Sequence, residues 1–459
     1  MHLMTLAVFL PLALGAANLQ PNPSLLLDRS EGKPIEGKYI VKLNTKNITA
    51  LHHIVSLLNI TPDHHYTHAI VGFAANLTDE HVKKLKADPL LHYIEQDVEI
   101  DAPSIETEAD EDFRKPQDEA ETTVQVGGGD EATVSTDKIT MSSARSHERR
   151  MTKIKRLGSL FPRGQLPAGV VTQVFAPWGL ARLSHLKPGI WGYRYHRSAG
   201  ENVCVYVLDS GLSHLHPDFN GRAKFLKNFS ADPDDDYFGH GTYIAGIIGS
   251  KNYGVAKKAN ILGVKVQGNN GASRRSAILA GMDFVVRDAR SRSCPRGVVV
   301  NVSVAGPLSK AINNAAGKIV RSGYFLAVGA GNWGKSALNY SPASERLACT
   351  VGAIDKRDRL GHYSNWGPGV NILAPGADIR SLASSSRNRK YASRGPSFKT
   401  GTSVATPHIA GLGAYLLGLG KSADGLCGYI RSTALKGVVD LGIHSNDGTP
   451  NLLANNGIQ

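Results

Sequence analysis

The sequence predicts an α/β fold built around a buried, mostly parallel β-sheet. Residues 203–208 are apolar at every position and lead into Asp209. Residues 323–329 form a second strand-like run that enters a series of glycines, and residues 402–417 are mostly small or apolar, as in a buried helix. Strands that are apolar at every position are typical of sheets covered on both faces, and functional groups gather at the carboxyl ends of such strands.

Three reactive side chains stand at the ends of these elements. Asp209 follows the apolar strand, His240 begins an apolar helix-like run, and Ser403 lies in the first turn of the last helix, which Thr402 can cap. A serine hydroxyl becomes a nucleophile when a histidine takes its proton, and a carboxylate holds that histidine in the right tautomer. The pattern predicts a catalytic triad of Ser403, His240 and Asp209.

A fourth polar group follows the second strand. Asn332 comes directly after Gly329-Ala330-Gly331, and its amide is suited to donate a hydrogen bond to a tetrahedral oxyanion. Each of these residues alone has an ordinary structural explanation, such as a turn former or a core histidine. Their occurrence together, on elements of the right type, favours the catalytic interpretation.

These motifs resemble those of the subtilases, and within them the fungal proteinase K-like branch. The order Asp, His, Ser along the chain is the subtilisin order, and the similarity extends from about Ala176 to the C-terminus. The resemblance implies a mostly parallel sheet flanked by helices in residues 171–459. It also implies a serine endopeptidase of broad specificity that uses acyl-enzyme chemistry.

The resemblance further implies a substrate cleft with two edges that pair with an extended peptide. The residues of these edges are Gly271 and Ala272 on one side, and Ser303, Val304, Ala305 and Gly306 on the other. Because they include no acidic side chain, we expect cleavage after apolar or aromatic residues. Arg274 and Arg275 should favour acidic residues further upstream. Ala305, where relatives usually have glycine, should shift the preference toward smaller residues.

The first 170 residues divide into three parts. Residues 1–17 have a short apolar core followed by small residues, which predicts a cleaved secretory signal and an extracellular protein. Residues 36–102 show alternating strand and helix patterns and resemble the subtilisin propeptide-inhibitor domain, which blocks the cleft of its own protease. Residues 103–170 are polar and aperiodic, which predicts a disordered linker. The pair Lys155-Arg156 is a candidate processing site, and a merely solvated basic pair is the alternative.

Four cysteines and several glycosylation motifs fit an extracellular protein. Four cysteines allow three disulfide pairings, and the resemblance selects Cys204–Cys294 and Cys349–Cys427. Asn47, Asn59, Asn76 and Asn228 are glycosylation candidates in Asn-x-Ser/Thr motifs. Asn301 has the same motif but lies in an apolar strand, so we do not expect its modification.

The charge distribution is uneven. The chain has a net charge of +13; the first 170 residues carry 18 basic and 23 acidic residues, and the rest carry 34 and 16. Opposite charge should assist association between the N-terminal domain and the protease. Nucleic-acid binding is the rival explanation, and we do not expect it because no recognition motif accompanies the scattered basic residues.

No cofactor is expected for the chemistry. Asn371 stands where relatives often place a calcium-ligating aspartate, so a structural calcium site is doubtful. Tyr243 replaces a second histidine near His240 that does not belong to the triad. We expect a monomer without a stable membrane span, acting on protein and peptide substrates and inhibited by its own propeptide. The alternative is a catalytically inactive subtilase that serves as a binding protein.

Overall fold

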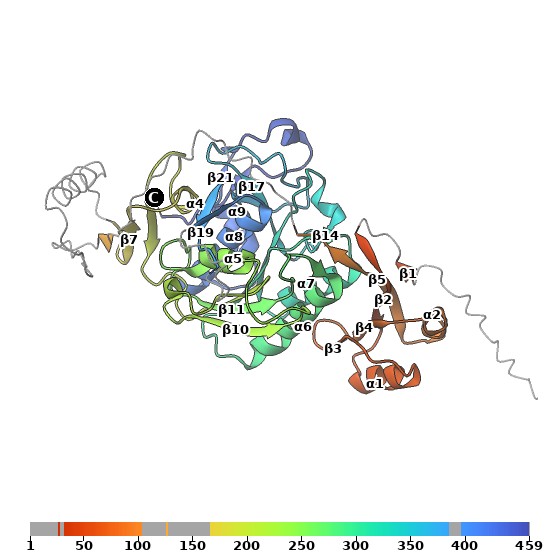
Figure 1. Cartoon of the computed structure of the whole chain (residues 1–459). Helices are drawn as coiled ribbons and strands as arrows, with labels where there is room; N and C mark the ends of the chain where they lie inside the picture. The colour runs from red at the N-terminus through yellow and green to blue at the C-terminus, as the bar shows by residue number, and fades with distance from the viewer. Residues whose placement is uncertain (1–25, 28–31, 103–124, 127–165, 385–395, 459) are drawn as a thin grey trace, which may run out of the picture.

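The computed structural model describes residues 26–27, 32–102, 125–126, 166–384 and 396–458 (Figure 1). The predicted signal peptide and Lys155-Arg156 lie outside these ranges, as does most of the predicted linker 103–170. Within the described ranges, no helix has both the length and the apolar character needed to cross a membrane.

The N-terminal domain is a small sheet covered by two helices, drawn in red to orange in Figure 1. Its strands run in the order β1-β5-β2-β4-β3. These elements agree with the alternating strand and helix patterns predicted for residues 36–102. The elements are β1 (Leu26–Leu27), β2 (Lys33–Leu43), α1 (Ile48–Leu57), β3 (His64–Tyr66), β4 (Gly72–Asn76), α2 (Asp79–Ala87) and β5 (Leu91–Ile100).

Helix α2 begins with a capping box formed by Thr78 and His81. Thr78 is the N-cap, and its side chain accepts a hydrogen bond from the backbone N–H of His81. The His81 ring in turn accepts a hydrogen bond from the backbone N–H of Thr78. Glu80 is one residue too early for this position and forms an ion pair with Lys84 at 2.8 Å.

A nine-stranded sheet forms the centre of the larger domain. Its order is β10-β11-β9-β13-β15-β17-β18-β22-β21, and all pairings are parallel except that between β21 and β22. This confirms the predicted mostly parallel sheet. The strands are β9 (Cys204–Asp209), β10 (Ala223–Asn228), β11 (Asn260–Lys265), β13 (Val298–Val302), β15 (Phe325–Gly329), β17 (Cys349–Ile354), β18 (Ile372–Pro375), β21 (Leu435–Lys436) and β22 (Leu452–Leu453).

Helices cover both faces of this sheet. Val205 and Val207 of β9 pack in one core with α5 and α8, whereas Tyr206 and Leu208 pack on the opposite face with α6 and α7. Because both faces are buried, strand 203–208 is apolar at every position. The helices are α4 (Trp178–Leu183), α5 (His240–Gly249), α6 (Arg275–Ser291), α7 (Lys310–Arg321), α8 (Thr402–Gly418) and α9 (Leu426–Thr433).

Short elements complete the larger domain. Strand β7 (Val170–Gln173) pairs with β6 (Gln125–Val126) and β8 (Tyr193–His196), so the described end of the predicted linker enters a strand. Two further strand pairs are β14 (Gly306–Pro307) with β16 (Tyr340–Ser341), and β19 (Ile379–Ser381) with β20 (Ser397–Lys399). The 3-10 helices are η3 (Pro217–Phe219), η4 (Ala337–Asn339) and η5 (Gly442–Asn446).

The N-terminal domain is joined to the larger domain by one strand pairing and by contacts with α6 and α7, the two helices that lie nearest to it in Figure 1. Strand β12 (Ser273–Arg274) pairs antiparallel with the end of β5, with Ser273 opposite Ile100. Asp283 of α6 accepts hydrogen bonds from the backbone N–H groups of residues 67–69 at 2.6–3.2 Å. A turn of the N-terminal domain is therefore fixed by a carboxylate of the larger domain.

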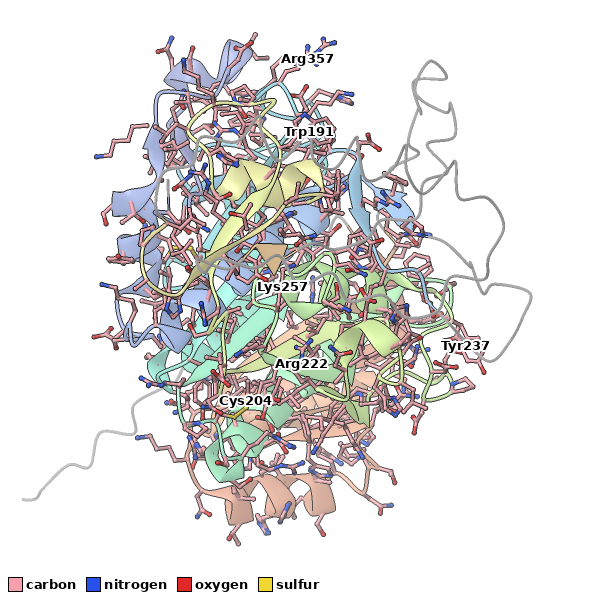
Figure 2. All side chains as sticks on the ribbon, turned by 90° about the vertical axis from the view of Figure 1, so that its left-hand side faces the viewer. Trp191, Cys204, Arg222, Tyr237, Lys257 and Arg357 are labelled. Atoms are coloured by element: carbon pink, nitrogen blue, oxygen red, sulfur yellow. A yellow bond between two sulfur atoms is a disulfide. The ribbon has the colours of Figure 1, made fainter. Side chains whose placement is uncertain are left out.

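Two disulfides connect distant parts of the larger domain, in the pairing that the resemblance implied. Cys204, labelled in Figure 2, is bonded to Cys294. This bond ties the start of β9 to the segment after α6. Cys349 is bonded to Cys427 and ties β17 to α9. These bonds account for all four cysteines of the chain.

Candidate active site

The structure brings together Asp209, His240 and Ser403, which stand at the ends of three different elements. The Nδ1 atom of His240 lies 2.7 Å from Oδ1 of Asp209, and its Nε2 atom lies 3.3 Å from Oγ of Ser403. All three residues are buried. With Nδ1 donating to the carboxylate, Nε2 is left to accept the proton of the serine hydroxyl. The longer contact is common in proteases without substrate, where catalytic hydrogen bonds tighten on binding.

A carboxylate that was not predicted fixes the helix on which His240 stands. The N-cap of α5 is Gly239, whose φ of 82° suits glycine and which offers no capping side chain. Asp236 supplies the cap instead: its Oδ2 atom accepts from the N–H of Thr242 at 2.7 Å, and its Oδ1 atom accepts from Gly239 N–H and from Ser210 Oγ. The loop before α5 thus holds the histidine and the residue after Asp209 together.

Helix α8 begins one residue earlier than the capping prediction required. Its N-cap is Gly401, and Thr402 is the first residue of the helix rather than its cap. The φ of 150° at Gly401 lies in the region that favours glycine, so the chain turns there before Thr402. Ser403 remains in the first turn, as predicted, and the hydroxyl of Thr402 is available for another contact.

That contact orients Asn332. Its Oδ1 atom accepts hydrogen bonds from the backbone N–H of Thr402 at 2.8 Å and from the Thr402 hydroxyl at 2.9 Å. The same hydroxyl accepts from the N–H of Gly331 at 3.1 Å. Because Oδ1 has two donors, the opposite end of the amide, Nδ2, is the end available to a ligand.

A buried lysine lies on the strand next to Asp209, opposite it in the register. Lys265 ends β11, and its Nζ atom donates to the carbonyls of Ser210 and Asp235 and to Oδ1 of Asn269. Burial lowers the pKa of Lys265, while the carboxylates of Asp236, Asp232, Asp209 and Asp235 oppose that shift. Lys265 therefore places a positive charge between the loop after Asp209 and one predicted edge of the cleft.

The end of β5 lies between the two predicted cleft edges. On one edge, a Cβ added to Gly271 would lie 2.4 Å from the Phe238 ring and 2.8 Å from Cβ of Ala102. On the other, a Cβ added to Gly306 would lie 2.5 Å from Cδ1 of Ile100. Backbone pairing occurs at Ser273–Arg274, just beyond Ala272. Ser303 contacts the catalytic serine instead of the end of β5: its hydroxyl donates to the backbone carbonyl of Ser403 at 2.9 Å.

The residues that depart from the family motif have structural partners. Tyr243 is buried, and its hydroxyl donates to the carbonyl of Ile379. The Oδ1 atom of Asn371 accepts from the N–H of Thr350 at 2.7 Å, which uses one of its two lone pairs. Within the described ranges, no group of three or more His, Cys, Asp or Glu residues is placed to hold a metal.

The glycosylation candidates differ in their surroundings. Asn47, Asn59 and Asn76 are exposed. Asn228 is partly buried, and its Nδ2 atom donates to the carbonyl of Asp232 and to the carboxylate of Asp234. A glycan at Asn228 would have to replace those bonds, whereas the other three sites require no such change.

Sequence reasoning missed Asp236, Lys265 and the second role of Thr402. Asp236 has a recognisable position four residues before His240, within an acidic run. Lys265 is a lone charge at the end of an apolar strand, a pattern that indicates a buried and fully bonded cation. The role of Thr402 depends on the approach of Asn332, 70 residues away, and has no local signal.

Comparisons with known proteins agree with this geometry. The subtilase family matches residues 200–439, and the peptidase inhibitor I9 family matches residues 38–102. Proteinase T of Parengyodontium album is 51% identical over 287 residues, covering 62% of this chain and 94% of that protein. A cuticle-degrading protease of Metarhizium anisopliae is 38% identical over 463 residues and covers both chains completely.

A solved structure is also similar. The crystal structure of a cold adapted subtilisin-like serine proteinase gives a TM-score of 0.55 at 34% identity, covering 61% of this chain and 98% of that one. The chain belongs to the subtilase family of serine proteases, with an inhibitor-type propeptide domain ahead of the protease.

Proposed function

We propose that this chain is a secreted serine endopeptidase of broad specificity, made as a zymogen that processes itself. In this proposal residues 1–17 are the signal peptide, 36–102 the inhibitory propeptide, 103–170 the linker and 171–459 the mature enzyme. The observation that carries the proposal is the arrangement of Ser403, His240 and Asp209, at 3.3 Å and 2.7 Å, beside an amide held by Thr402.

The mechanism follows from these contacts. Ser403 Oγ attacks the carbonyl carbon of the scissile bond while its proton passes to Nε2 of His240. Asp209 keeps the imidazole oriented and stabilises its charged form. The oxyanion accepts a hydrogen bond from Nδ2 of Asn332. His240 then protonates the leaving amine, and a water that it activates hydrolyses the acyl-enzyme.

The position of β5 supports inhibition by the propeptide. Strand β5 occupies the backbone edge at β12, and the residues that follow it lie beside Gly271. A substrate needs the same edge, so the two compete. Release of the domain after cleavage of the chain would open the cleft.

Specificity is proposed from the two cleft edges. Ala305 narrows the main pocket relative to glycine, so the enzyme should cut after apolar residues with some preference for Leu, Met or Ala over the largest aromatics. Replacing Ala305 with glycine should move the preference toward aromatics by about 1 kcal/mol. Profiling both enzymes on a peptide library measures this shift. Dominant cleavage after Lys or Arg would refute the pocket assignment.

The central test is Ser403→Ala, expressed in a host without other secreted proteases. The variant should be secreted uncut and should not react with a fluorophosphonate label, whereas Ser422→Ala, which changes an exposed serine, should mature and react. Added wild-type enzyme should cut the Ser403→Ala protein at the natural site, which would show that it is folded. Full maturation of Ser403→Ala alone would contradict self-processing.

A further inference from the structure

The face of β5 that lies on the larger domain carries two carboxylates, Glu95 and Asp97. They are alternate residues of one strand, so both side chains project to the same face. Both are buried, with 2% and 3% exposure. Because β5 pairs with β12 at Ile100, these carboxylates lie five and three positions upstream of the residue opposite Ser273.

Asp97 is bound at the start of α6. Its Oδ1 atom accepts from the N–H of Ser276 at 3.0 Å, and its Oδ2 atom accepts from the Ser276 hydroxyl at 2.5 Å. Ser276 is the second residue of a 17-residue helix. The free N–H groups and the dipole at such a terminus favour a negative charge.

Glu95 is bound at the start of α7. Its Oε2 atom accepts from the N–H of Ala311 at 3.1 Å, and its Oε1 atom lies 3.0 Å from Nη1 of Arg275. Ala311 is the second residue of a 12-residue helix. Two helix termini and one guanidinium therefore converge on two carboxylates that are not part of the protease domain.

Besides the two helix N-termini, the side chain of Arg275 also indicates a binding site for an anion. Its side chain is 2% exposed, and Nη1 donates to the carbonyl of Gln96 at 2.8 Å. In the described part of the chain its Nη2 atom has no hydrogen-bond partner. Arg275 is also the first residue of α6, where a positive charge opposes the helix dipole. Once the N-terminal domain leaves, the carboxylates of β5 no longer compensate the positive charge of Arg275 or the positive end of the α6 dipole.

We propose that the mature enzyme uses these groups as a distal subsite for substrates with acidic residues upstream of the cut. An extended peptide that pairs with β12 in the register of β5 would place one acidic side chain at Ser276 and another, two residues earlier, at Arg275 and Ala311. The preferred ligand is an extended strand with the pattern Glu-x-Asp. This inference rests on the proposed function, because the peptide must occupy the same cleft.

Two internally quenched peptides test the subsite with the processed wild-type enzyme. They share all residues from the position opposite Ser273 through the cut and beyond. One carries Glu and Asp five and three positions upstream, and the other carries Gln and Asn there. We expect kcat/KM about tenfold higher for the acidic peptide at low salt, mainly through KM. The ratio should shrink as salt is raised.

In the variant Arg275→Gln, the ratio of kcat/KM for the acidic peptide to kcat/KM for the neutral peptide should fall close to one. The matched control is Arg287→Gln, which removes an exposed charge from the same helix and should keep the wild-type ratio. If Arg275→Gln does not mature, the subsite is tested by the kcat/KM ratio of the wild-type enzyme for the two peptides and by the salt dependence of that ratio. Equal kcat/KM for the two peptides would overturn the subsite, whereas failure to cut either peptide would overturn the proposed protease function.

Discussion

In the proposed mechanism, the two ends of the Asn332 amide have different tasks. Oδ1 accepts two hydrogen bonds from Thr402, which fixes the amide and leaves Nδ2 as the end available to a ligand. A donor fixed before the reaction needs no reorganisation when charge develops on the substrate. Its contribution should therefore appear in turnover rather than in substrate binding.

Replacing Asn332 with alanine should lower kcat by about a hundredfold or more and leave KM nearly unchanged. Steady-state kinetics on a chromogenic peptide measures both constants. An unaltered kcat would show that the amide does not contact the oxyanion.

Thr402→Val is the companion experiment. Valine keeps the shape of threonine but removes the hydroxyl that donates to Asn332 and accepts from Gly331. If Thr402 acts through Asn332, valine should lower kcat in the wild-type background and have little further effect in the Asn332→Ala background. Additive losses in the double variant would assign Thr402 an independent role.

Among the elements, α5 depends on a cap that comes from outside the helix. Asp236 satisfies two backbone N–H groups at its start and bonds to Ser210. Asp236→Asn would turn one oxygen into a donor that faces a backbone N–H group. We expect the free energy of unfolding to fall by roughly 1–3 kcal/mol and kcat to fall because His240 is less well held.

The measurements are denaturant unfolding of the inhibitor-treated enzyme and kcat at one pH. Asp234→Asn, an exposed change in the same loop, is the matched control and should leave both quantities close to wild type. A normal kcat in Asp236→Asn would show that the position of His240 does not depend on this cap.

Helix α8 contains a buried histidine from which we predict a pH-dependent stability. His408 is 1% exposed, and its Nδ1 atom donates to the carbonyl of Val404. Burial lowers the pKa of His408 to about 4. Between the ordinary value near 6.5 and this value, the unfolded chain binds a proton that the folded protein does not. The free energy of unfolding should therefore fall as the pH drops through this window, by roughly 2–3 kcal/mol at pH 4.5.

Denaturant unfolding of Ser403→Ala protein at pH 7.5 and pH 4.5 tests this. Adding His408→Gln should reduce the loss of stability between the two pH values, even if the variant is less stable at both. Adding His214→Gln, at an exposed position, should preserve the full loss. The same pH dependence with and without His408 would refute this account.

Some elements and site residues could be predicted from the sequence, and others could not. The run 203–208 could be assigned to a buried strand because each residue meets one of two cores. The triad was predicted as a set because each member stands at an element end with its own local pattern. The partners of Asn332 and Asp97 could not be predicted, because they lie 70 and 179 residues away and are selected by tertiary packing.

The whole molecule is held by two disulfides as well as by its cores. The bond Cys349–Cys427 joins residues 78 positions apart. In the chain-entropy model a loop of this size stabilises the folded state by roughly 4 kcal/mol. The double change to serine should lower the free energy of unfolding by up to that amount, with activity retained at low temperature.

Thermal inactivation rates and denaturant unfolding of the inhibitor-treated double variant provide the measurement. The corresponding change at Cys204 and Cys294 is an informative comparison, because that bond is attached to the strand that ends at Asp209. Unchanged stability without Cys349–Cys427 would mean that packing alone holds α9 against β17.

The pairing of β5 with β12 has a consequence for the proteins that this enzyme would digest. Strand β5 is ten residues long and fully extended where it meets the larger domain. A segment that takes its place must first leave its own helix, sheet or turn. Digestion of a compact protein would then proceed at the rate at which about ten residues open locally, a quantity set by the local stability of the target. Partly unfolded and loop-rich proteins would be consumed first, and well-packed ones would persist beside them.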